Sequence, residues 1–163
     1  MPEKIYVGDL ESLVENKKVE GKQLKIGNEN FYKITNVDKM RPFFMSIVSN
    51  SNHWMFISST GSLSAGRKNS EFSLFPYYTD DKITESSDTT GSKTIILVKK
   101  NNKNFLWEPF SNRYEGAYKV SRNIYKNTIG NKVIFEEINH DLNVEFSYQW
   151  NSSNIYGFVR KSS

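Results

Sequence analysis

Residues 142–150 read LNVEFSYQW, and this stretch decides the fold class of the chain. Apolar side chains at every second position alternate with polar ones, the apolar set being Leu142, Val144, Phe146, Tyr148 and Trp150. Successive side chains of a strand point to opposite faces of a sheet. The period of two therefore predicts an antiparallel strand with one buried face and one solvated face.

The rest of the chain repeats this pattern in shorter runs. β-branched and aromatic residues gather between Asn, Ser, Gly and Asp residues, which is typical of strands separated by turns. We expect further strands at residues 31–35, 43–49, 53–59, 94–99, 104–108, 114–120, 132–138 and 155–160. Residues 100–104 (KNNKN) and 127–131 (NTIGN) carry turn-forming Asn and Gly, and the first suits a tight hairpin. Residues 61–66 (GSLSAG) are interpreted as a hairpin turn.

One segment near the N-terminus fits a helix. Leu10, Leu13 and Val14 follow the spacing i, i+3, i+4 after a cap residue at Asp9, which predicts a short amphipathic helix. Many strands at short spacing favour two packed antiparallel sheets over alternating strands and helices. The sequence thus predicts an all-β fold, an antiparallel two-sheet β-sandwich with one short N-terminal helix.

Length and composition bound the organisation and exclude several function classes. A single domain spanning residues 1–163 is expected, because a chain of this length buries roughly 70% of its unfolded surface. A net charge of +4 gives no reason to expect a nucleic-acid partner. The absence of cysteine excludes disulfides and cysteine chemistry, and the polar segment 84–93 is expected to be a loop.

No membrane partner is expected, because the longest apolar runs fall far short of the roughly 18 residues of a spanning helix. The first ten residues lack the apolar run of a signal peptide, which favours a cytoplasmic protein. No motif for a cofactor or a metal is found, and none is expected.

Adjacent carboxylates and two histidines are the groups with catalytic potential. Glu136 and Glu137 are neighbours on a predicted strand, so their side chains point to opposite faces and do not easily share one substrate. We interpret them as one surface residue and one near an edge. His140 is interpreted as a turn residue, and Trp107 as a core residue.

The loop at residues 67–81 is the candidate binding segment. It combines cations, aromatic rings and paired carboxylates, the candidate residues being Arg67, Lys68, Tyr77, Tyr78, Asp80 and Asp81. Sugars stack their C–H faces on aromatic rings and take charge-assisted hydrogen bonds through their hydroxyls. The alternative is structural, with Phe72, Leu74 and Phe75 as core residues of an edge strand.

The order of these segments resembles the N-terminal domain of the cellobiose and chitobiose phosphorylase family. The resemblance covers about residues 40–150 and is carried by FFMSIVSN (43–50), a Gly-containing turn, YYTDD (77–81), TIILVKK (94–100), FLWEPF (105–110), YEGAYKVSRNIY (114–125) and DLNVEFSYQW (141–150). It implies the two-sheet supersandwich that galactose mutarotases also have, in partial form. The family's substrate-proximal loop falls on the six candidate residues, although Arg67 stands nearly alone where the family has several arginines.

The resemblance implies a non-catalytic accessory domain of a carbohydrate-active enzyme. In that family the domain flanks a helical barrel that carries the general acid and the phosphate site, and nothing in this chain matches the barrel. The expected partners are therefore carbohydrate, an adjacent catalytic domain of a glycoside phosphorylase or hydrolase, or a second copy in a homodimer. Two alternatives remain: a protein–protein assembly module, and a mutarotase-type epimerase using His53 or His140 with Glu136.

Overall fold

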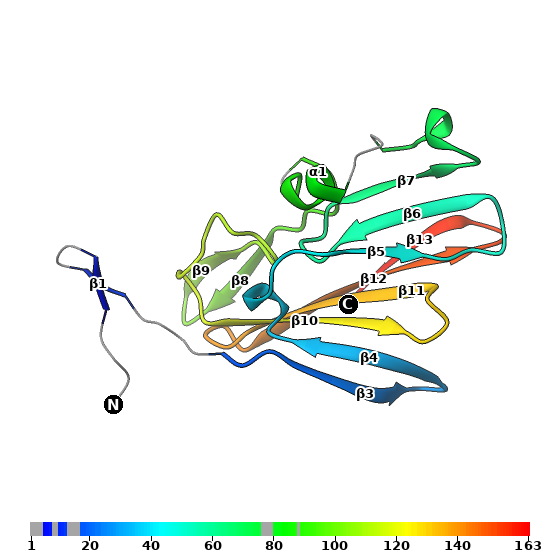
Figure 1. The fold of residues 1–163 in the computed structure, drawn as a ribbon. Coiled ribbons are helices and arrows are strands. Elements are labelled where there is room, and N and C mark those ends of the chain that lie inside the picture. The colour runs from blue at the N-terminus through cyan, green and yellow to red at the C-terminus, as the bar shows by residue number, and fades with distance from the viewer. Residues whose placement is uncertain (1–4, 8–9, 13–16, 76–79, 88) are drawn as a thin grey trace.

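The computed structural model describes residues 5–7, 10–12, 17–75, 80–87 and 89–163 (Figure 1). This part of the chain is all-β, and every strand pair is antiparallel. The strands are β1 (Ile5–Val7), β2 (Leu10–Ser12), β3 (Glu20–Ile26), β4 (Glu29–Thr35), β5 (Phe44–Ile47), β6 (His53–Ser58), β7 (Leu63–Arg67), β8 (Ile96–Lys100), β9 (Lys103–Trp107), β10 (Val120–Asn127), β11 (Lys132–Asn139), β12 (Val144–Ser153) and β13 (Gly157–Ser162). The helical segments are the α-helix α1 (Asp80–Glu85) and the 3₁₀ helices η1 (Val37–Lys39) and η2 (Ser70–Phe72).

The largest sheet has the strand order β13-β12-β11-β10-β4-β3. Strands β10 to β13 follow one another along the chain and across the sheet, and β4 pairs with β10 to add the β3–β4 hairpin (Figure 1). Strands β10 and β11 therefore lie in the interior of this sheet, while β3 and β13 form its edges.

Strand β11 defines the two faces of this sheet. Its residues alternate strictly between buried and partly exposed, so that Val133, Phe135 and Glu137 point to one side and Glu136 to the other. We call the side of Phe135 the core face and the side of Glu136 the outer face. The alternation predicted for residues 142–150 is confirmed on β12, where Phe146 and Tyr148 are buried.

The core face packs against two of the other sheets. The three-stranded sheet β5-β6-β7 and the β8–β9 hairpin share one buried apolar cluster with it. That cluster includes Ile57, Leu63, Trp107, Phe135 and Tyr148, each at most 3% exposed. Because burying a large apolar side chain contributes roughly 1.5–3 kcal/mol, this cluster is the main source of stability.

Most strand predictions are confirmed with shifted ends. The structure has strands over most of 31–35, 43–49, 53–59, 94–99, 104–108, 132–138 and 155–160. The hairpin predicted at 100–104 is also present, because Asn101 and Asn102 adopt the positive φ values of 51° and 57° that join β8 to β9.

The predicted N-terminal helix is wrong. Leu10–Ser12 is strand β2, which pairs with β1, while Asp9, Leu13 and Val14 lie outside the described residues. A segment of about two helical turns has a high nucleation cost, so strand pairing outweighs its helical spacing. The α-helix of the described chain is instead α1, and the loop predicted from residue 84 begins within it.

Two further assignments are corrected. Residues 112–118 form turns rather than a strand, because Gly116 has φ 81° and the Ala117 amide donates to the Tyr114 carbonyl at 3.0 Å. Residues 63–67, expected to lie mostly in a turn, form strand β7. Gly66 is required there by close packing, since a Cβ would lie 2.5 Å from the Trp54 ring.

Candidate functional site

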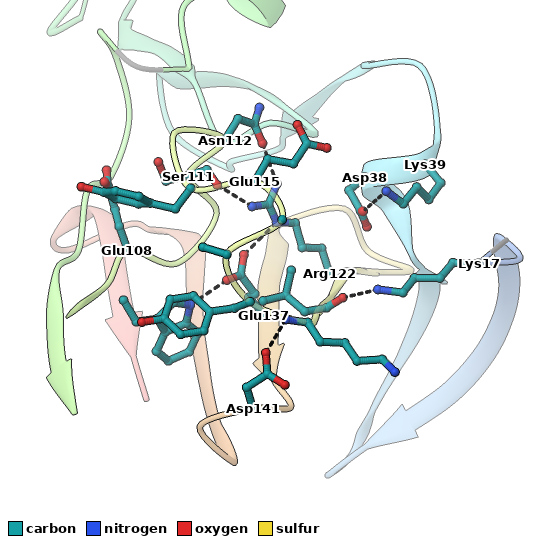
Figure 2. A pocket seen from close by; sticks show the side chains of 17 residues that line it. Lys17, Asp38, Lys39, Glu108, Ser111, Asn112, Glu115, Arg122, Glu137 and Asp141 are labelled. Atoms are coloured by element: carbon teal, nitrogen blue, oxygen red, sulfur yellow. Dashed lines mark hydrogen bonds and ion pairs between the residues drawn. The ribbon is translucent and has the colours of Figure 1, made fainter. Parts of the chain in front are cut away.

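A pocket of about 600 Å³ lies between the loop that follows β9 and the central strands of the large sheet (Figure 2). Residues 107–108 and 111–112 together with the turns at 114–119 form one wall, and β10 and β11 supply Arg122 and Glu137. Lys17, Asp38 and Lys39 complete the lining on the opposite side.

Glu137 is the most deeply buried acid of this pocket, at 2% exposure. Its Oε1 accepts a hydrogen bond from Trp107 Nε1 at 2.8 Å. Its Oε2 accepts from the Phe110 amide and from Arg122 Nε, both at 2.7 Å. The carboxylate thus connects β9, the following loop and β10.

The Arg122 side chain is also held by several contacts. Strand pairing places it directly opposite Glu137 on the core face. Its NH1 donates to Asn112 Oδ1 at 2.8 Å and its NH2 donates to the Ser111 carbonyl at 2.7 Å. The ion pair therefore holds residues 110–112 against the sheet, and it is a support of the pocket wall.

The other groups of the wall differ in how far they are open to solvent. The Tyr114 ring is 48% exposed, and Glu115 is exposed beside it. The Tyr118 hydroxyl donates to the Leu106 carbonyl at 2.7 Å, which anchors the turns to β9. The Glu108 side chain is only 6% exposed, and Lys93 lies 3.8 Å from its carboxylate.

Amines and acids alternate around the other side of the pocket. Lys17 Nζ donates to the Val120 carbonyl at 2.5 Å, and Lys39 lies 3.4 Å from Asp38. Asp141 accepts from the Lys119 amide at 2.7 Å. A pocket that is lined by an exposed aromatic ring, carboxylates and amines can bind a ligand that has both an apolar face and many hydroxyls.

The six residues predicted from the sequence lie elsewhere or outside the description. Arg67 ends β7, and its Nε donates to His53 Nε2 at 2.9 Å. Lys68 has φ 59° and its Nζ lies 5.2 Å from the Phe72 ring centroid. Tyr77 and Tyr78 lie outside the described residues. Asp80 and Asp81 begin α1, and only their backbone is described.

The structure therefore brings Arg67 and Lys68 together at the end of β7, and neither of these two lines the pocket. Carbohydrate contact through the six residues stays a prediction. The structural alternative for the same loop is wrong for two residues, because Phe72 and Leu74 are 54% and 66% exposed. Phe75 is half-buried and packs against the core.

The interpretation of the paired glutamates is half correct. Glu136 and Glu137 do point to opposite faces, but both lie on an interior strand and neither is a surface residue. Glu136 accepts hydrogen bonds from Tyr125 at 2.8 Å and Asn123 at 2.5 Å, and Lys33 lies 3.7 Å away. Burial, followed by the contact with Glu136, raises the pKa of Tyr125, so its hydroxyl stays a donor.

The histidines do not join Glu136 in a pocket. His53 bonds Ser51 and Arg67, and His140 bonds Ser121 at 2.9 Å. His140 follows β11 in a turn, as predicted, and neither histidine lines the pocket of Figure 2. Among the described residues, no group of three or more His, Asp or Glu side chains could hold a metal ion.

The sequence did contain a signal for Glu137. It continues the buried positions 133 and 135 of an alternating strand, and a charge on an apolar face requires a buried partner. That partner, Arg122, could not be identified, because β10 was not predicted. Within the described ranges, no helix is long and apolar enough to cross a membrane. No protein-family model matches the chain, and no curated protein matches it.

Proposed function

We propose that the chain is a non-catalytic accessory domain of a carbohydrate-active enzyme and that its pocket beside Arg122 and Glu137 contacts carbohydrate. The domain packs on a catalytic domain of a glycoside phosphorylase or hydrolase. Its two layers, the six-stranded sheet and the smaller sheets on its core face, form a partial sandwich of the mutarotase type. The shared apolar cluster supports this arrangement.

The observation that carries the proposal is the exposed Tyr114 ring beside hydrogen-bonding groups. Glu115, which is also exposed, lines the same pocket, so a carboxylate and an aromatic ring are both open to solvent there. Sugars need this combination, because their ring carbons are apolar and their hydroxyls both donate and accept. A pocket of about 600 Å³ lies within the range of roughly 300–1,000 Å³ that small-molecule sites occupy.

The hydrogen bonds and the burial of Glu137 favour a binding role of the pocket over a catalytic one. Glycoside cleavage needs a carboxyl group that can give its proton to the leaving oxygen. Glu137 instead accepts three hydrogen bonds from the protein and is nearly sealed from solvent. We therefore assign it to the support of the wall.

Calorimetric titration with cellobiose and diacetylchitobiose tests the proposal. Tyr114→Ala should weaken binding about fivefold, because a ring contact is worth roughly 1 kcal/mol. Tyr32→Ala is the matched control, since Tyr32 is 51% exposed and lies on β4 outside the pocket. Unchanged affinity in Tyr114→Ala with a loss in Tyr77→Ala or Tyr78→Ala would move the contact to the predicted loop. Absence of binding to the wild-type chain would contradict the proposal.

A second candidate function is assembly with another protein. Three turns meet at one end of the molecule (Figure 1), where the Val48 amide donates to the Gly130 carbonyl and Ser152 Oγ donates to the Val48 carbonyl. Val48, Ile129, Ile155 and Tyr156 are 48–83% exposed there. Exposed apolar residues gathered in this way favour an interface. A molar mass above that of one chain, restored to 18.9 kDa by Ile129→Lys, would support this candidate.

A further inference from the structure

A second pocket of about 260 Å³ lies on the other side of the segment 109–112. Its floor is formed by the rings of Phe110, Phe135 and Tyr148. Its rim carries hydroxyl groups from the β6–β7 turn and from the loop after α1, namely Ser59, Thr60, Ser87 and Ser92. The two pockets share Asp38, Asn112 and Arg122, so they adjoin at the segment that the ion pair holds.

Tyr148 occupies a fixed position in this floor. Its ring stacks on Phe135 with a centroid distance of 4.9 Å and an interplanar angle of 12°. Phe110 contacts it edge-on at 5.2 Å, and the Arg160 guanidinium lies 4.9 Å from its centroid. The side chain is held from several directions and is only 3% exposed.

Tyr148 lines this pocket, and no hydrogen bond joins its hydroxyl to another described residue. Buried hydroxyls are normally hydrogen-bonded, because burying one without a partner is unfavourable. Burial also raises the pKa of Tyr148, so the group remains an O–H donor at any physiological pH. A fixed donor without an acceptor among the described residues indicates a ligand or solvent acceptor in the pocket.

Gly61 keeps this donor accessible from the pocket. It lies on the rim with φ 91°, and a Cβ built on it would lie 2.8 Å from the Tyr148 hydroxyl oxygen. Any larger residue would cover the hydroxyl. The floor thus offers flat apolar rings and one donor, and the rim offers several hydroxyls.

We propose that this second pocket is a separate sugar site that holds one pyranose ring. The apolar face of the sugar lies on the Phe110 ring, and a sugar oxygen accepts the hydrogen bond of the Tyr148 hydroxyl. The rim hydroxyls of Ser59 and Ser92 bond the remaining sugar hydroxyls. The volume is below the range of roughly 300–1,000 Å³ typical of larger ligands, which fits a single ring. This inference rests on the proposed function.

Residue-resolved NMR titration with cellobiose tests the inference, since backbone amides report on each pocket separately. In the wild-type chain, the amides of Thr60, Gly61 and Ser92 should shift as well as those of Tyr114 and Glu115. Tyr148→Phe should weaken binding at the first group about fivefold, the loss expected for one hydrogen bond, and leave the second group unchanged. Tyr32→Phe is the matched control, because it removes a hydroxyl at an exposed position.

Tyr148→Phe should melt at or above the wild-type temperature, because its hydroxyl bonds no described residue and its removal relieves the burial of a polar group. Ser92→Trp, which fills the pocket from the rim, should abolish the shifts at Thr60 and Gly61. Shifts confined to Tyr114 and Glu115, or equal affinities of wild type and Tyr148→Phe at Gly61, would overturn the inference and leave the proposed function standing. Absence of shifts at both groups would overturn both.

Discussion

Glu136 and Glu137 are adjacent on β11, yet they lie in opposite environments. Glu137 points to the core face, is 2% exposed and bonds Trp107, Phe110 and Arg122. The Glu136 side chain points to the outer face, is 15% exposed and bonds Tyr125 and Asn123. A glutamate on the core face thus supports the pocket wall, whereas a glutamate on the outer face is a partly solvated group. The face of the strand, and not the residue type, determines the role.

Glu137→Gln should produce the largest loss of stability. The amide cannot accept from all three donors, so the Arg122 charge, on a side chain that is 18% exposed, loses its anionic partner. Removing one member of a buried ion pair costs about 3–5 kcal/mol. Urea denaturation of the variant measures this loss. A cost below about 1 kcal/mol, the usual value for an exposed pair, would show that the pair is not a support of the wall.

Glu136→Gln should have a smaller effect. Tyr125 and Asn123 can still donate to the amide oxygen, and solvent reaches the site. We expect about 1 kcal/mol, the usual net value of a hydrogen bond, in the same denaturation experiment. If Glu136→Gln costs as much as Glu137→Gln, the contrast between the two faces is wrong.

Glu29 extends the comparison to a more exposed carboxylate, whose side chain is 36% exposed. Hydrogen bonds from Lys132 and then Asn127 lower its pKa below the ordinary value of 4.5. A lowered pKa in the folded state means that this stabilisation is complete above pH 4.5 and is lost as the pH falls through the lowered value. Glu29→Gln should therefore be less stable than wild type at neutral pH. This difference in the free energy of unfolding should vanish in acid and shrink in high salt. A stability difference that persists at pH 2 would contradict this assignment.

The sequence predicted the β architecture because alternation is local. The pattern of residues 142–150 needs no distant partner to be recognised, and the Asn residues of 100–104 select their turn by backbone conformation alone. The strand at β10 was missed because its buried positions include Asn123 and Asn127, which hydrogen-bond Glu136 and Glu29 across the sheet.

The pocket was missed for a related reason. Arg122 and Glu137 are brought together by strand pairing. The pocket wall is a series of turns at 112–118, where the sequence predicted a strand. Charge and aromatic content favour the loop at 67–81 as a binding segment, because those features are visible in the sequence without any knowledge of strand pairing. A site that is assembled across two strands can be predicted only when their pairing register is known. The register of β10 against β11 cannot be derived from a sequence in which β10 is not recognised as a strand.

A crystal structure of the chain soaked with cellobiose tests the central claim most directly. The account predicts a sugar ring against Tyr114 in the pocket of about 600 Å³, with the contacts of Arg122 and Glu137 unchanged. A sugar bound only at Arg67 and Lys68, or a lattice of well-ordered molecules in which no sugar binds at saturating concentration, would contradict it.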